Sequence, residues 1–315
     1  MTESALNRRE LQPTILVVAP MPAAPASAGN RRRLAMTCEA LQRAGFAIDF
    51  AYFAHEDQIY RRFGQLPPTD FAAMAAAFQR TFLIEPQTTI PLKTRSSTFG
   101  IDEWGAPELD RFVAWYAAAY PDTVAILVNY VFLSRCLEQA AGMLKLIDTH
   151  DRFADRQLQY KPFRAEPNFF YTDRRGEGLA LDRADVVLAI QSEEAAHFAA
   201  LTDRPVLLLP PVFPVQAPFV TPTRIAQIGF VGHGNDPNLF SISKFAHEWA
   251  ADWTPDRPVL RIAGEICNAL GALRLPGVTL LGYIDNLSDF YREIDVIVAP
   301  MLMGSGLKMK VGEAL

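Results

Sequence analysis

Short apolar runs alternate with helical segments along this chain, and this alternation constrains its fold most strongly. A run at residues 14–19 is followed by a loop of small residues, an amphipathic segment at 30–44 that ends at Gly45, and a second run at 46–53. Strand, loop, helix and strand in this order form a βαβ unit with parallel strands. Further strands are predicted at 81–84, 123–128, 143–147, 184–190 and 206–209, and helices at 131–142 and 192–201, the latter capped near Ser192. The pattern predicts an α/β fold with a doubly wound parallel sheet.

A proline-rich stretch separates this series from a second one. Residues 210–223 contain five prolines and little helical pattern, so we interpret them as a hinge. Strands are then predicted at 226–231, 259–263, 278–281 and 295–299, with a helix at 238–251. The chain is therefore predicted to have two Rossmann-like domains, an N-terminal one at 1–209 and a C-terminal one at 224–315.

Composition and charge exclude several classes of protein. Half of the 315 residues are hydrophobic, so sizeable cores can form, and a net charge of −5 gives no basic footprint for nucleic acid. No run reaches the roughly 18 apolar residues of a spanning helix, and residues 1–12 lack the apolar core of a signal peptide. Cys38, Cys136 and Cys267 are far apart and odd in number, as in buried, reduced thiols. We therefore predict a cytoplasmic protein.

The stretch at residues 304–315 carries a candidate anion site. It follows an apolar run at 294–300, so a strand, a glycine loop and a helix start come in this order. Gly304, Ser305 and Gly306 can turn backbone N–H groups inward, the helix N-terminus adds partial positive charge, and Lys308 and Lys310 add two full charges, which suits a diphosphate. Glu313, three residues past Lys310, could accept hydrogen bonds from a sugar hydroxyl. In the alternative, the glycines make an ordinary turn and the lysines are solvated.

Acidic residues and a histidine come directly after the strand predicted at 143–147. Asp148, His150 and Asp151 are expensive to bury without a role, so we expect them at the ligand-binding edge of the sheet. The alternative is local, with Asp151 capping a helix and His150 packed on a neighbour. No zinc-like spacing or Ser-His-Asp pattern is present, and no metal site is predicted.

Two further loops follow predicted strands. Gly29 and Arg31 follow the first strand, and Gly232 and His233 follow the strand at 226–231. Carboxyl ends of strands are where open α/β sheets bind ligands. The alternatives are plain turns and, for the arginines at 31–33, either a solvated helix start or contact with anionic lipid head groups.

The sequence resembles family 4 (group 1) glycosyltransferases of the GT-B fold, in three segments above all. These are 282–287 (GYIDNL), 295–300 (DVIVAP) and 304–314, in which a G-S/T-G-x-K-x-K loop leads into a helix with Glu-Ala. The resemblance implies two facing sheets with a cleft between them, a first domain that holds the acceptor, and a second that holds the nucleotide sugar. It further implies a retaining transfer that needs neither metal nor cofactor, often in cell-surface polysaccharide or glycolipid synthesis at the cytoplasmic face of a membrane.

The resemblance also implies roles for the candidate residues. Lys308 and Lys310 would bind the donor diphosphate with the 304–306 loop, Glu313 would hold the ribose, and Gly232 and His233 would approach the phosphates. Asp148, His150 and Asp151 would lie near the reacting sugar, and Gly29 with Arg31 would face the acceptor, a sugar or a lipid-linked sugar.

Departures from the family pattern leave alternatives open. Ser305 stands where many members carry a glutamate, and His233 and Asn235 stand near where many carry an arginine and a lysine, so more phosphate charge rests on Lys308 and Lys310. The chain stops at Leu315, inside the motif helix, which leads us to expect an incomplete second domain. The alternatives are a truncated or degenerate member that binds without turnover, and a nucleotide-sugar epimerase.

Overall fold

The computed structural model describes residues 12–62, 69–213, 221–284 and 286–314. The chain separates into two compact units, Met1–Pro211 and Val212–Leu315. Each unit has its own parallel sheet, with helices between successive strands. The structure thus confirms the predicted α/β class.

The sheet of the first unit has seven strands in the order β3-β2-β1-β4-β5-β6-β7, and all its neighbours run parallel. The strands are β1 (Thr14–Ala19), β2 (Ala47–Phe53), β3 (Arg80–Ile84), β4 (Thr123–Asn129), β5 (Leu144–Asp148), β6 (Val186–Ala189) and β7 (Val206–Leu208). The strand order reverses between β1 and β4, which makes the carboxyl edge of these strands the topological switch point. Ligand sites of open α/β sheets lie at such edges.

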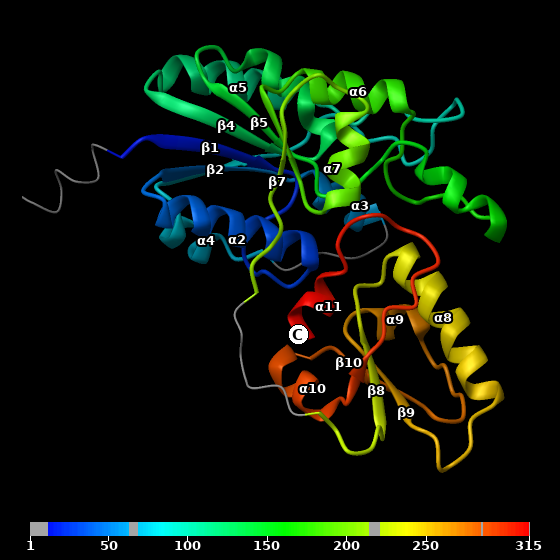
Figure 1. The fold of residues 1–315 in the computed structure, drawn as a ribbon. Coiled ribbons are helices and arrows are strands. Elements are labelled where there is room, and N and C mark those ends of the chain that lie inside the picture. The colour runs from blue at the N-terminus through cyan, green and yellow to red at the C-terminus, as the bar shows by residue number, and fades with distance from the viewer. Residues whose placement is uncertain (1–11, 63–68, 214–220, 285, 315) are drawn as a thin grey trace, which may run out of the picture. The chain divides into compact units, whose positions relative to one another are not determined.

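Helices cover both faces of this sheet, with α2 and α4 on one face and α5 on the other (Figure 1). The helices are α2 (Gly29–Arg43), α3 (His55–Arg62), α4 (Phe71–Ala77), α5 (Pro107–Ala119), α6 (Arg174–Asp182) and α7 (Ser192–Ala199), with 3-10 turns η1 (Val131–Gln139), η2 (Arg156–Gln159) and η3 (Lys161–Phe163). Helix α2 ends as predicted, because Gly45 has a φ of 95° that terminates it.

Two helix predictions were wrong in detail. The segment predicted as a helix at 131–142 is the 3-10 helix η1, in which six of nine residues are buried. A surface α-helix buries a single apolar stripe, which is a smaller share of its residues than η1 buries. The conformation of this segment is therefore decided by tertiary packing and not by its helical sequence pattern. Ser192 is the first residue of α7 and does not cap it, since Gln191 occupies the N-cap without a side-chain hydrogen bond.

The sheet of the second unit has four strands in the order β10-β9-β8-β11. They are β8 (Gln227–Val231), β9 (Val259–Ala263), β10 (Val278–Gly282) and β11 (Val296–Ile297), and the helices are α8 (Asp236–Ala251), α9 (Ile266–Leu270), α10 (Leu287–Glu293) and α11 (Met309–Ala314). The strand predicted at 295–299 is shorter than expected and is not buried, because β11 lies at an edge with Val296 37% exposed. Strands β8 and β11 are neighbours, so the loops after them share one edge.

Candidate active site

Asp148, at the end of β5, is fully buried and forms an ion pair with Arg33 of helix α2. The Arg33 Nε atom lies 2.9 Å from Asp148 Oδ2 and its Nη2 atom 2.8 Å from Oδ1, while Nη1 donates to the carbonyl oxygen of Leu209 at 2.8 Å. The guanidinium therefore holds the ends of β5 and of the β7 segment to α2. Removing one member of a buried, bidentate ion pair leaves the other charge uncompensated. The main structural role of Asp148 is therefore to neutralise Arg33.

His150 lies two residues further on, in a left-handed conformation with a φ of 58°. Its ring stacks on Tyr130 at 4.5 Å between ring centroids, and its Nε2 atom lies 2.7 Å from Oδ1 of Asn129. The Asn129 amide nitrogen donates to the carbonyl oxygen of Val18, so its oxygen faces His150 and the proton is assigned to Nε2. The Nδ1 atom of a neutral His150 then carries a lone pair.

Burial lowers the pKa of His150 to about 4, although the negative charge of Asp148 opposes this shift. The carboxylate Oδ2 lies 3.8 Å from Nε2. At neutral pH the imidazole is therefore uncharged, and it can accept a hydrogen bond at Nδ1 but cannot serve as a cationic acid.

Asp151 forms an ion pair with Arg156, whose guanidinium also lies 4.5 Å above the ring of Phe153. Both predicted carboxylates of this edge, Asp148 and Asp151, are thus bound by arginines. His150 packs on the neighbouring ring of Tyr130, as the alternative interpretation of this residue predicted. The predicted roles of all three near a reacting sugar stay predictions.

Gly29 begins helix α2, and Arg31 and Arg33 both lie in the first turns of the same helix. Arg31 is 3% exposed and Arg33 2% exposed, so these two arginines do not form a solvated cluster. The alternative of a solvated helix start is therefore wrong for these two side chains, and contact with lipid head groups stays a prediction. The neighbouring Asn30 donates from Nδ2 to the hydroxyl of Tyr130 at 3.1 Å, which joins α2 to the His150 region.

In the second unit, the turn after β8 packs closely against α8. A Cβ atom added at Gly232 would lie 3.0 Å from the Phe230 ring and 3.1 Å from Asn238 Nδ2, so this position favours glycine. His233 Nε2 lies 2.7 Å from Glu265 Oε2, and its carbonyl oxygen accepts from Asn238 Nδ2 at 2.9 Å. The turn is therefore held on both sides.

The glycine loop adopts the turn that was predicted, but with a different lining. Gly304 and Gly306 have φ values of 91° and 80°. The Lys308 ammonium lies 3.3, 3.0 and 3.1 Å from the carbonyl oxygens of Gly304, Ser305 and Gly306. The glycines predict N–H groups that turn inward, whereas the structure places three carbonyl groups around Lys308, because its ammonium is a strong local donor.

Lys310 lies at the start of α11 and reaches back to β8 and α8. Its Nζ atom lies 3.7 Å from the centroid of the Phe230 ring and 3.0 Å from Asn238 Oδ1. Burial, aided by the positive charge of Lys308, lowers the pKa of Lys310 to about 7. The sequence predicted Lys310 but not its contacts with Phe230, near the end of β8, and Asn238, in the first turn of α8; the predicted turn at Gly232 and His233, which lies between them, was the available signal.

Glu313 lies near Lys310 as predicted, but its hydrogen bond is to another residue. Its Oε2 atom accepts from the Tyr291 hydroxyl at 3.0 Å. The carboxylate is therefore oriented from α10, and its ribose-binding role stays a prediction.

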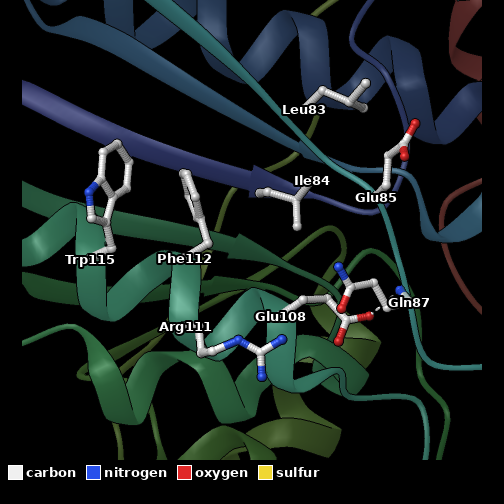
Figure 2. Close-up of a pocket in the computed structure, with 8 residues that line it drawn as sticks. All are labelled: Leu83, Ile84, Glu85, Gln87, Glu108, Arg111, Phe112 and Trp115. Atoms are coloured by element: carbon white, nitrogen blue, oxygen red, sulfur yellow. Dashed lines mark hydrogen bonds between the residues drawn. The ribbon is translucent and has the colours of Figure 1, made fainter.

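A separate hollow of about 550 Å³ lies between β3 and α5 (Figure 2). Leu83, Ile84, Glu85 and Gln87 line it from the strand side, and Glu108, Arg111, Phe112 and Trp115 line it from the helix. It contains none of the residues predicted from the sequence, and its lining is half aromatic or aliphatic and half charged or polar. The hollow is therefore separate from the polar residues at the carboxyl edge of the first sheet.

Within the part of the chain that the structure describes, no group of three or more His, Cys, Asp or Glu side chains is placed to hold a metal ion. The described helices likewise include none that is long and apolar enough to cross a membrane.

Comparison with solved structures defines the fold. The chain is similar to a sucrose-phosphate synthase from Thermosynechococcus elongatus, with a TM-score of 0.62 and 18% identity over 96% of this chain and 78% of the other. It is also similar to the pneumococcal O-GlcNAc transferase GtfA in complex with UDP and GlcNAc (TM-score 0.57, 11% identity, 96% and 82% coverage). A third is the UDP-forming trehalose-phosphate synthase of Burkholderia xenovorans in complex with glucose-6-phosphate (0.55, 12%, 96% and 82%). The fold is the GT-B fold of glycosyltransferases.

The family of the second unit follows from its sequence. Residues 226–315 match the family described as "Glycosyl transferases group 1", whereas no curated protein matches the chain. The match includes the three segments that carry the resemblance, and it confirms the similarity to group 1 glycosyltransferases for residues 226–315.

Proposed function

We propose that this protein transfers a sugar from a nucleotide-diphosphate sugar to an acceptor hydroxyl, with retention of anomeric configuration and without a metal ion. The observation that carries the proposal is the pair Lys308 and Lys310 on the glycine loop, within the segment that matches the family. Because two of the similar structures are described with UDP or as UDP-forming, uridine diphosphate is the first leaving group to test.

The lysine pair would stabilise the departing diphosphate. As the glycosidic bond breaks, negative charge grows on the phosphate oxygens, and fixed positive charge at that place is typically worth several kcal/mol of barrier. The Lys308 ammonium lies within 3.3 Å of three loop carbonyls, so phosphate binding would exchange some of these contacts for charged ones. Two lysines supply the charge that a divalent cation supplies elsewhere. Glu313, oriented by Tyr291, would accept hydrogen bonds from the ribose.

The first unit would contribute an uncharged polar edge. His150, neutral and with its Nε2 proton held by Asn129, would accept a hydrogen bond from a sugar hydroxyl at Nδ1. Asp148 and Asp151 would act through their arginine partners by fixing the loop that carries His150. Gly29 and Arg31 would face an acceptor sugar or lipid-linked sugar. We place the reaction in the cytoplasm, in cell-surface polysaccharide or glycolipid synthesis.

Calorimetry against UDP, GDP and ADP tests the donor site. Wild-type chain should bind one diphosphate, and Lys308→Ala should weaken that binding about 10- to 100-fold, because a hydrogen bond to a charged group contributes roughly 1.5–3 kcal/mol. Lys244→Ala is the matched control, since Lys244 lies on α8 of the same unit and pairs with Glu248 at the surface. A folded wild-type chain that binds none of the three, or a Lys308→Ala variant that binds as tightly as wild type, would refute the proposal.

Turnover tests the finer claims. With a donor of the chosen base, the anomeric configuration of the product, read by NMR, should match that of the donor. Excess EDTA should leave the rate unchanged. Inversion, or loss of activity in EDTA that Mg²⁺ or Mn²⁺ restores, would contradict retention or metal independence respectively.

A further inference from the structure

Asn238, in the first turn of α8, joins two loops that the sequence treats separately. Its Nδ2 atom donates to the carbonyl oxygen of His233 at 2.9 Å, and its Oδ1 atom accepts from Lys310 Nζ at 3.0 Å. Its backbone N–H is capped by the Asn235 side chain at 3.1 Å. The carbonyl of His233 fixes which way the amide points, so the oxygen must face the lysine. A Cβ atom added at Gly232 would lie 3.1 Å from the nitrogen of this amide, so the turn packs tightly against it.

Among the residues that the structure describes, the two close partners of the Lys310 ammonium are both uncharged. One is Asn238, and the other is the ring of Phe230, 3.7 Å away. The charged group that faces Lys310 with the same sign is Lys308, and the one with opposite sign is Glu313, which accepts the hydrogen bond of the Tyr291 hydroxyl. This is an unusual place for an ammonium, because a half-buried cation normally has a carboxylate partner.

We propose that Asn238 is a positioning residue of the diphosphate site: its amide holds the Lys310 ammonium over Phe230 without neutralising it, so that the bound diphosphate becomes the counter-ion of Lys310. The inference rests on the proposed function. An aspartate at this position would place Lys310 equally well but would supply a counter-ion from the protein itself.

Proton uptake on binding follows from this arrangement. With a pKa of about 7 in the free protein, about nine-tenths of Lys310 is protonated at pH 6 and about one-tenth at pH 8. A bound diphosphate favours the charged form and raises this pKa. The affinity therefore loses about a factor of ten between pH 6 and pH 8, and binding at pH 8 takes up close to one proton.

Two aspartate variants separate direct contact from general charge. Asn238→Asp places a carboxylate against Lys310 and keeps it protonated throughout this range. We expect about tenfold weaker diphosphate binding at pH 6, and a pH dependence that is smaller than that of wild type by about a factor of ten. Asn235→Asp adds the same charge in the same turn and retains the N-cap, so its pH dependence should equal that of wild type. Titration of the ligand itself cancels in these comparisons. An Asn238→Asp variant with the wild-type pH dependence would overturn the assignment.

Calorimetry on the wild-type chain keeps the proposal testable if Asn238→Asp does not fold. The binding heat of the diphosphate at pH 8, measured in buffers of different ionisation enthalpy, gives the protons taken up. Terminal phosphates, with a second pKa near 6, are already ionised at this pH, so uptake comes from the protein. Uptake near one proton that disappears in Lys310→Met supports the proposal, and uptake near zero in wild type refutes it. Absence of diphosphate binding at every pH would instead refute the proposed function.

Discussion

The Arg33–Asp148 pair offers the sharpest test of how the edge of the first unit is built. The side chains are 3% and 0% exposed and meet through bonds of 2.8 to 3.1 Å. Asp148→Ala leaves a buried guanidinium without its carboxylate, and Arg33→Met leaves a buried carboxylate without its guanidinium. Removing one partner of such a pair costs about 3–5 kcal/mol, so each single variant should lose that much stability.

The double variant should cost much less than the sum of the two, because neither charge is then left alone. We expect a coupling energy of at least about 2 kcal/mol in the double-mutant cycle. Arg43→Met is the control on the same helix. Arg43 lies 3.9 Å from Glu39, both side chains are mostly exposed, and its removal should cost below about 1 kcal/mol.

Urea titration followed by hydrogen exchange of peptides from α2 and β5 reports the first unit separately from the second. A loss below about 1 kcal/mol for Asp148→Ala, or strict additivity in the cycle, would show that the pair does not hold this edge. It would also remove the reason for treating Asp148 as a partner of Arg33 rather than as a group free for the reaction.

Three further predictions follow from burial and backbone conformation. The pKa of His150 falls from 6.5 to about 4 on folding, so the unfolded chain binds more protons between these pH values and the free energy of unfolding rises with pH there. In urea titrations, wild type should be about 2 kcal/mol less stable at pH 5 than at neutral pH, and His150→Gln should lack this difference. Gly264→Ala should cost about 3 kcal/mol or more of stability, because φ is 95° and the new Cβ would lie 2.5 Å from the carbonyl oxygen of Gly232. Gly271→Ala is the control: its φ is 59° and its Cβ would enter open space, so it should cost about 1–2 kcal/mol. Equal shifts of the urea midpoint in the two variants would contradict the clash. Burial raises the pKa of Cys38 to about 12, so a disulfide reagent at pH 8 should leave this thiol unmodified until urea unfolds the chain, and rapid native labelling would contradict its burial.

The two units place charge in opposite ways. At the edge of the first sheet, Asp148 and Asp151 form ion pairs with arginines, and His150 is neutral at neutral pH. At the loops of the second sheet, the close partners of Lys310 in the described part of the chain are the uncharged Asn238 and Phe230. This division agrees with the proposed assignment of the diphosphate to the second unit.

Strand positions could be predicted from the sequence because each buried strand is a local apolar run. The strand at 14–19 matches β1 residue by residue, and that at 259–263 matches β9. The glycine loop and its lysines were also local, since Gly304, Gly306, Lys308 and Lys310 lie within seven residues. Edge strand β11 and the 3-10 helix η1 were mispredicted because burial by distant segments, not the local pattern, decides them.

The sequence by itself thus determined the α/β class, the alternation of strands and helices, and the residue types at each loop. Tertiary structure alone decided their partners. Arg33 meets Asp148 across 115 positions of sequence, and Lys310 meets Asn238 across 72. Whether a side chain is a solvated charge, half of an ion pair or a cation without a counter-ion depends on which strands are neighbours in the sheet. Charge and pKa are set by what surrounds a group in space, and a single sequence does not contain those distances.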